Sequence, residues 1–425
     1  MAAMAATTST LVAWTTIPQR PQPGQMPSCT FQVRLAPKDV NRWVGPGAHG
    51  GATPAPTAAV ATLAAGPATG AAAAFAGAAC TRRRHRRYGL REAPRPFAAA
   101  DAAAASARSA TPVAATAEGP PPPPRRFQVP GGGAALEVLG GPATDGSNES
   151  GARSVVLLLI HGSYHAAWCW EPHFLGFFRS KGYDTYALSL RGQGLGTVDG
   201  ELPAVAGTLE VHAGDIVAFI QHLSEERGLP VVVLGHSFGG LIVQRAVADL
   251  VEAGSGAVAG MALLASVPPS GNGGLVWRYL WRSPWLALQI TWGFLTRAFE
   301  RDAALCQELF FDRDVPLADL EGYMQKMRDG CPAGTRLLDL RELQRSLPVP
   351  AVPGSLPVLV LGGDRDAIVD VEALDETAAA HGVRSCLVEG ATHDAMLGPR
   401  WHLAAETVLA WLQELESRRH DQTPK

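Results

Sequence analysis

Seven apolar segments that read as β-strands alternate with helical patterns, and this alternation limits the possible folds more than any other feature. The segment "SVVLLLIHG" (154–162) is apolar without interruption, as expected of a strand buried on both faces. Strict alternation of strand and helix predicts an α/β fold, with a mostly parallel sheet flanked by helices. The strand-like segments are 135–140, 154–162, 185–190, 231–235, 260–266, 357–363 and 385–390, and the helical patterns are 212–227, 239–251, 371–382 and 402–419.

Residues 270–345 interrupt the alternation, because they separate two strands without contributing a strand that we can predict. They are far too long for a simple crossover connection. We therefore expect an inserted helical cap over 270–345, with the core domain formed by 127–269 and 346–425. Within the cap, Ser283-Pro284 has the pattern of an N-cap followed by the first residue of a helix.

The first 117 residues differ in composition from the rest of the chain. They are rich in Ala, Thr, Ser and Pro, and they contain 12 Lys and Arg but only 3 acidic residues. Such a composition predicts disorder, and it is also typical of an organelle transit peptide. Its length and proline content favour a chloroplast over a mitochondrion, and "RRRHRR" (82–87) leaves a nuclear signal as a third interpretation. A proline-rich linker is expected over 118–126.

The remainder of the chain is acidic, with 24 basic and 36 acidic residues. A domain with this balance lacks the surplus cations that bind phosphates, so we expect no nucleic-acid partner. The six cysteines are scattered without a CxxC pair, which predicts reduced thiols and no metal site. No apolar run reaches the roughly 18 residues that a membrane span requires.

The motif Gly235-His236-Ser237-Phe238-Gly239 lies between a predicted buried strand and a predicted helix. A G-x-S-x-G sequence at such a junction is typical of a nucleophile elbow, in which a sharp turn exposes the serine hydroxyl. The positions two before and two after the serine must hold small residues, because strand and helix approach closely there, and Gly235 and Gly239 meet this requirement. Ser237 is therefore the candidate nucleophile, although an isolated match of five residues would read as an ordinary turn.

A serine needs a base to remove its proton, and an imidazole needs an acid to orient it. His393 follows the last predicted strand and should lie at the same sheet edge as Ser237. After the strand 357–363, the chain offers three acids, and the spacing favours Asp366 as the partner of His393. Asp364 is the alternative acid, and Asp370 is better placed to cap the next helix.

The tetrahedral intermediate of acyl transfer needs two backbone donors for its oxyanion. The amide of Phe238, directly after the nucleophile, is one candidate. The loop "HGSYHAAW" (161–168) follows a buried strand, and we expect the amide of Ser163 to be the second. An ordinary turn after a strand is the other interpretation of this loop.

Together these motifs resemble the α/β-hydrolase superfamily over residues 127–420. The segments "HGSYHAAWCW", "GHSFGG" and "HDAMLGP" are most similar to plant methylesterase and hydroxynitrile-lyase relatives, and "LSLRGQG" to uncharacterised plastid hydrolases. The resemblance implies a serine hydrolase with a helical cap and without a metal or organic cofactor. Where the lyases carry a lysine after the histidine, this chain has Asp394, whose charge opposes the stabilisation of cyanide.

The resemblance thus predicts a serine-dependent carboxylic ester hydrolase with the triad Ser237, His393 and Asp366. A non-catalytic, receptor-like binding protein is the alternative, and a hydroxynitrile lyase is a third. An apolar stripe in the cap favours a hydrophobic or lipid-like substrate. The stripe either packs on the core as a lid or contacts a membrane peripherally, and its members are Trp285, Leu288, Trp292, Leu295 and Phe299.

Overall fold

In the computed structural model, the described residues are 123–144, 153–198, 203–331 and 335–422. The expected transit region, 1–117, lies outside the described residues, as does the linker up to residue 122. The strand β1 begins at Arg125, so the end of the predicted linker is already part of the sheet. No helix within the described ranges is long and apolar enough to cross a membrane.

The centre of the fold is a nine-stranded sheet with the order β1-β2-β4-β3-β7-β8-β10-β11, in which β5 also pairs with β2. In this spatial order, each strand from β4 through β3, β7, β8 and β10 to β11 is parallel to its neighbour. The pairs β1–β2, β2–β4 and β2–β5 are antiparallel. The α/β class and the mostly parallel sheet are confirmed. The strands are β1 (Arg125–Gln128), β2 (Ala134–Gly141), β3 (Val156–Ile160), β4 (Thr185–Ser189), β5 (Thr197–Val198), β7 (Val231–His236), β8 (Val258–Leu264), β10 (Val358–Gly363) and β11 (Ser385–Val388).

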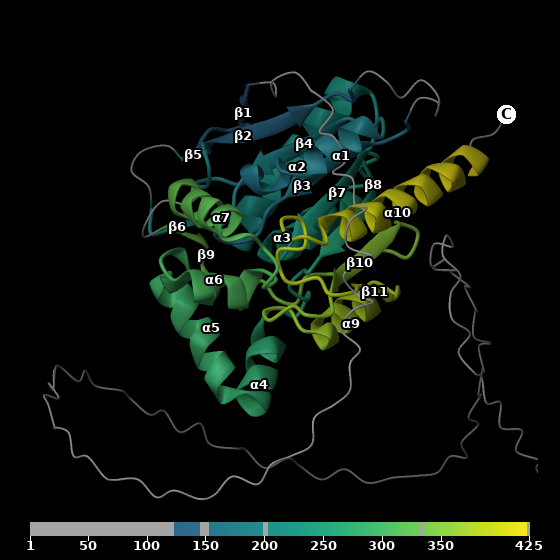
Figure 1. Cartoon of the computed structure of the whole chain (residues 1–425). Coiled ribbons are helices and arrows are strands. Elements are labelled where there is room, and N and C mark those ends of the chain that lie inside the picture. The colour runs from purple at the N-terminus through teal and green to yellow at the C-terminus, as the bar shows by residue number, and fades with distance from the viewer. Residues whose placement is uncertain (1–122, 145–152, 199–202, 332–334, 423–425) are drawn as a thin grey trace, which may run out of the picture. The chain divides into compact units, whose positions relative to one another are not determined.

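Helices cover both faces of this sheet, because its central strands are apolar on both sides (Figure 1). In β3, Leu157 and Leu159 belong to one core cluster, whereas Leu158 and Ile160 belong to the other, and all four are fully buried. One cluster includes side chains of α2 (Leu209–Arg227), α3 (Phe238–Glu252) and α9 (Val371–Ala380). The other includes side chains of the 3₁₀ helix η1 (Ala167–Trp170), α1 (Phe174–Ser180) and α10 (Trp401–Gln422).

The segment between β8 and β10 is mostly helical, but it also contains a strand that the sequence did not reveal. Strand β9 (Arg336–Leu338) pairs in parallel with β6 (Val205–Gly207) in a separate two-stranded sheet. The expectation of a strandless insertion is therefore wrong, because three residues are too few to display a strand periodicity. The helices are α4 (Gly273–Arg282), α5 (Pro284–Thr296), η2 (Ala298–Glu300), α6 (Ala303–Phe310), α7 (Leu317–Gly330) and α8 (Leu340–Leu343).

The predicted break between the first two cap helices is present. Ser283 accepts a hydrogen bond from the amide of Leu286 at 3.4 Å, and Pro284 is the first residue of α5. These two helices form a V at the bottom of the coloured part of the chain in Figure 1.

The predicted apolar stripe is present on α5, but it does not pack on the core as a lid. Its first four members are 52–74% exposed: Trp285, Leu288, Trp292 and Leu295. Phe299 is fully buried instead, because Arg297 adopts a left-handed conformation (φ 53°) that ends α5 before the stripe reaches Phe299.

Candidate active site

Ser237 occupies a strained turn between β7 and α3, with φ 54° and ψ −126°. A non-glycine residue adopts such angles only where the surrounding structure enforces them. A Cβ atom on Gly235 would lie 2.7 Å from Cα of Gly240, and one on Gly239 would lie 2.0 Å from the carbonyl oxygen of His161. Both glycines are therefore required by close backbone contacts, as expected of a nucleophile elbow.

The loop after β3 lies directly against the candidate nucleophile. A Cβ atom on Gly162 would approach the Cβ of Ser237 to 2.8 Å. The next residue is Ser163, and neither its amide nor that of Phe238 donates a hydrogen bond within the described part of the chain. Two backbone donors beside a buried serine are what an oxyanion hole requires.

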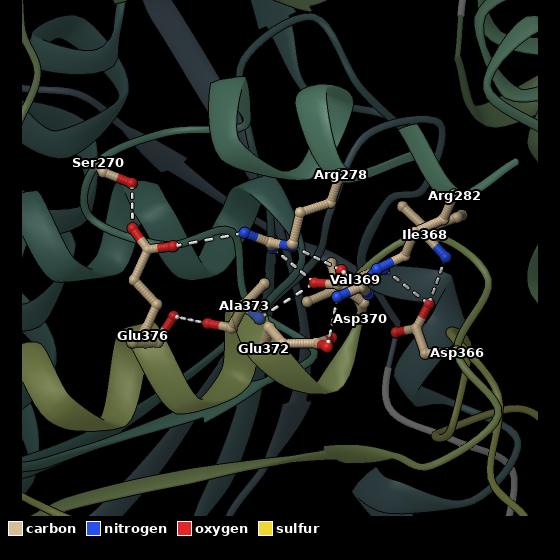
Figure 2. Close-up of polar contacts among 11 residues, drawn as sticks. Ser270, Arg278, Arg282, Asp366, Ile368, Val369, Asp370, Glu372, Ala373 and Glu376 are labelled. Atoms are coloured by element: carbon tan, nitrogen blue, oxygen red, sulfur yellow. Dashed lines mark hydrogen bonds and ion pairs between the residues drawn. The ribbon is translucent and has the colours of Figure 1, made fainter. Parts of the chain in front are cut away.

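The candidate base and acid are in direct contact. His393 donates from Nδ1 to Oδ2 of Asp366 at 2.8 Å, and both side chains are almost fully buried. The other oxygen of Asp366 accepts hydrogen bonds from the amides of Ile368 at 2.7 Å and Val369 at 2.9 Å (Figure 2). These bonds fix the carboxylate and the histidine tautomer, which leaves Nε2 of His393 as its basic nitrogen.

Two loops meet because they follow adjacent parallel strands, β10 and β11. A Cβ atom on Gly363 would lie 2.0 Å from the carbonyl oxygen of Ala391, so the loops touch at their beginnings. His236 joins them to the elbow, since its Nε2 donates to the carbonyl oxygen of His393 at 3.1 Å. The residue before the nucleophile thus contacts the residue proposed as the base.

The other acids after β10 have different partners. The carboxylate of Asp364 is exposed and accepts a hydrogen bond from the amide of Gly390 at 2.6 Å. Asp370 accepts from the amide of Ala373 at 3.0 Å and thereby caps α9, as predicted. Among the three acids, Asp366 accepts the hydrogen bond of His393.

His161 is also near the elbow, but both of its ring nitrogens are occupied. Nε2 accepts a hydrogen bond from the amide of Leu190 at 2.9 Å, and Nδ1 donates to the carbonyl oxygen of Gly162 at 2.8 Å. Burial lowers the pKa of His161 to about 3, so the ring is neutral. It therefore holds the loop after β3 in place and is not available as a base.

The electrostatic environment of His393 favours its protonated form. Burial by itself would lower its pKa, but the charge of Asp366 and the hydrogen bond with that carboxylate outweigh burial. The nearby charge of Asp394 acts in the same direction, and the pKa of His393 lies above its ordinary value. A base of this kind can accept a proton from serine and return it to a leaving group.

A second histidine–carboxylate pair, which the sequence did not predict, lies beside the first. His165 donates from Nε2 to Oδ2 of Asp394 at 3.0 Å and from Nδ1 to the carbonyl oxygen of Ser163 at 3.0 Å. Both side chains are buried. The pair thus connects the loop of Ser163 with the loop of His393.

Both ring nitrogens of His165 face oxygen atoms, and those of His236 and His393 lie near the same carboxylate. Burial by itself would raise the pKa of Asp394, but His165, His236 and His393 together hold it below its ordinary value. The sequence gives a weak indication of this pair, namely a histidine two residues after Ser163 and an aspartate next to His393.

One group of side chains has a composition that suits a metal ion. His236, His393 and Asp394 each place one ligand atom within 4.8 Å of the others. Coordination by His393 would compete with the role of base predicted for it, and His236 already donates a hydrogen bond to a carbonyl oxygen. We therefore assign these groups to the hydrogen-bond network of the site.

Replacement of Asp394 by asparagine is expected to change the pH dependence of turnover. The base must be neutral to accept a proton, so kcat/KM falls as the pH drops through the pKa of His393. Asp394→Asn removes a charge that raises this pKa. The acid limb of the profile should therefore move to lower pH, measured as kcat/KM between pH 4 and pH 9.

The matched control is Glu225→Gln, which removes an exposed charge on α2 and should leave the acid limb in place. If Asp394→Asn lowers kcat/KM uniformly without moving the limb, then Asp394 has no electrostatic effect on the base.

Comparison with known proteins agrees with this fold. The sequence profile of the Alpha/beta hydrolase family matches residues 157–407, which include all the candidate site residues. Comparison with functionally curated proteins gave no significant match.

Several solved structures have a similar fold. A putative lipase from Acinetobacter baumannii AYE is 17% identical with a TM-score of 0.50, over 70% of this chain and 92% of that one. A thermophilic esterase from Thermogutta terrifontis is 19% identical (TM-score 0.48; 69% and 100% covered), and monoglyceride lipase from Saccharomyces cerevisiae is 16% identical (TM-score 0.48; 72% and 99% covered). From the profile match, supported by the sheet and the elbow, the chain belongs to the Alpha/beta hydrolase family.

Proposed function

We propose that the protein is a serine-dependent hydrolase that cleaves carboxylic esters with a hydrophobic acyl or alcohol part. The observation that carries the proposal is the pair of His393 and Asp366, joined by a 2.8 Å hydrogen bond on loops that contact the Ser237 elbow. Two backbone amides hold one oxygen of the Asp366 carboxylate, so that the other oxygen faces His393. Its third hydrogen bond serves to orient the histidine.

In the proposed mechanism, Ser237 attacks the ester carbonyl while His393 removes its hydroxyl proton. The charge of Asp366 stabilises the imidazolium that forms. His393 then donates this proton to the leaving alcohol, and an acyl-enzyme remains on Ser237. A water molecule, activated by the same histidine, hydrolyses the acyl-enzyme and regenerates the serine. These steps require neither a metal ion nor an organic cofactor.

The oxyanion of each tetrahedral intermediate would accept hydrogen bonds from the amides of Ser163 and Phe238. The half-buried position of both residues strengthens such bonds, because little water competes for the donors. His165 forms a hydrogen bond with the carbonyl oxygen of Ser163, so the orientation of this loop depends on the buried pair with Asp394.

The preference for a hydrophobic ester rests on the aromatic residues next to the base. The ring of Phe310 lies 6.1 Å from that of His393, and Phe294 of α5 lies 5.8 Å from Phe310. Tyr164, next to Ser163, lies 5.5 Å from Phe294. A substrate bound between the base and α5 would contact apolar rings, which suits acyl chains better than charged groups.

Longer acyl chains should therefore be better substrates. For p-nitrophenyl esters, kcat/KM is expected to rise at least about tenfold from acetate to octanoate, because each buried methylene contributes up to about 0.8 kcal/mol. The measurement is the initial rate for acetate, butyrate, hexanoate and octanoate below their critical micelle concentrations, with Ser237→Ala as the blank.

A preference for acetate over all longer chains would contradict the hydrophobic substrate. Absence of turnover with every ester, in a folded protein, would instead favour the receptor-like binding function.

The similarity to plant methylesterases and plastid hydrolases, and the location in a chloroplast, remain proposals. They rest on the motifs and on the composition of residues 1–117.

A further inference from the structure

The α4–α5 hairpin exposes an apolar surface on the side of the cap that faces solvent. We call it the hairpin face. Each of its members is 47–74% exposed. The surface of a soluble protein normally contains charged residues among its apolar ones. The members are Val276, Trp277, Leu280, Trp281, Trp285, Leu288, Trp292 and Leu295.

The composition of this hairpin suits an apolar environment. Helix α5 has no charged residue from Pro284 to Thr296. Its polar side chains are satisfied internally or by the neighbouring helix: the hydroxyl of Thr291 donates to the carbonyl oxygen of Ala287 at 2.7 Å, and that of Thr296 to Trp292 at 2.7 Å. Gln289 donates to Glu308 at 3.0 Å. The two threonine hydroxyls therefore keep their hydrogen bonds when the helix leaves water.

The charged residues of the hairpin are fixed at the side where it meets α9. Arg278 forms two hydrogen bonds with Asp370, at 2.7 and 2.6 Å, and Arg282 binds Glu372 at 2.7 Å (Figure 2). Glu376 lies 4.0 Å from Arg278 and also accepts a hydrogen bond from Ser270. The arginines are thus neutralised by the core domain, and the hairpin face carries no net charge toward a partner.

Helix α5 also contributes to the aromatic group beside the candidate active site. Phe294 lies on the same helix as Trp292 and Leu295, and its ring lies in the aromatic group that reaches His393. The hydroxyl of Tyr164 donates to the carbonyl oxygen of Phe294 at 3.1 Å, so α5 is also joined to the loop of Ser163. The hairpin and both loops of the candidate site are therefore connected by packed aromatic side chains.

We propose that the hairpin face binds the surface of a lipid bilayer, with its tryptophans at the level of the head groups. Four tryptophans in two consecutive helices favour this occupant, because an indole ring combines an apolar body with an N–H donor and partitions to the membrane interface. The projecting V of α4 and α5 suits insertion into a deformable surface (Figure 1). That the bilayer also supplies the ester substrate rests on the proposed function.

The test is co-sedimentation of the full chain with phosphatidylcholine vesicles. The wild-type protein is expected to bind, and Trp281→Ser/Trp285→Ser should lower the partition coefficient at least about tenfold. Both side chains are 72% exposed, so the variant should unfold at the same temperature as the wild type. Binding should change little between 0.05 and 0.5 M salt, because the arginines are already paired.

The control variant is Leu317→Ser/Leu340→Ser, which removes two exposed leucines from α7 and α8 and should bind as the wild type does. A second measurement uses vesicles that contain brominated phosphatidylcholine. The bromine atoms should quench the tryptophan fluorescence of the wild type more strongly than that of Trp281→Ser/Trp285→Ser.

Equal sedimentation of wild type and tryptophan variant, or no quenching, would overturn the proposal. So would a wild-type dimer in analytical ultracentrifugation that the tryptophan variant does not form and that does not bind vesicles, since a second copy would then cover the face. Ser237→Ala should bind vesicles normally. Binding without ester turnover refutes only the proposed function, and turnover of soluble esters without binding refutes only the lipid contact.

Discussion

Replacement of Ser237 by alanine is expected to lower ester turnover by about 10⁴-fold or more, because the acyl-enzyme can no longer form. His393→Ala should cause a similar loss, since the serine hydroxyl then has no base. The double variant should be little worse than the poorer single variant, because the two residues act in the same step. The measurement is kcat for p-nitrophenyl butyrate, corrected for the rate without enzyme.

Thermal unfolding of each variant provides the control, since neither substitution removes a large part of the core. Losses below about tenfold, or losses that multiply in the double variant, would exclude a serine–histidine mechanism. A third result would also be informative. Turnover that disappears with His393→Ala but survives in Ser237→Ala would indicate that water attacks the ester directly, with histidine as its base.

Replacement of Asp366 by asparagine should lower kcat by about 10³- to 10⁴-fold. The amide keeps the shape of the carboxylate, but it has no charge to stabilise the imidazolium. If its NH₂ group faces His393, it cannot accept the hydrogen bond from Nδ1. If the NH₂ group instead turns toward Ile368 and Val369, two backbone hydrogen bonds are lost. A pH profile of kcat should accompany the measurement.

Asp364→Asn is the matched control, because it removes the same charge two residues earlier, from an exposed carboxylate bound to the amide of Gly390. Its effect on kcat should be less than about tenfold. If Asp364→Asn is the damaging substitution and Asp366→Asn is not, the assignment of the acid is wrong.

The central strands could be predicted because burial on both faces leaves a continuous apolar signal. The carboxyl ends of parallel strands meet at one edge, so the positions of His393 and Asp366 followed from chain order and from the sheet. The short strands β1, β5, β6 and β9 carry two to four residues each, and in so few residues alternation is not visible.

The second buried pair could not be predicted, because His165 and Asp394 are separated by 229 positions and their contact depends on how two loops fold against each other. The exposure of the hairpin face is likewise a tertiary property. Helical spacing shows that apolar residues share one side of α5, but it does not show whether that side faces the core. The left-handed residue Arg297, which separates Phe299 from the stripe, has no clear sequence signature.

The arrangement of the turn after β10 has a consequence for any exchange of caps between members of the family. Asp366 near its beginning accepts a hydrogen bond from His393. Asp370 at its end binds Arg278 of the cap and caps α9 (Figure 2). A transplanted cap cut at the borders of the insertion would leave its acidic counterparts behind in the donor. A chimera that also carries the donor's residues 370–376 should keep the hairpin in its native orientation, so the transferable unit is discontinuous in sequence.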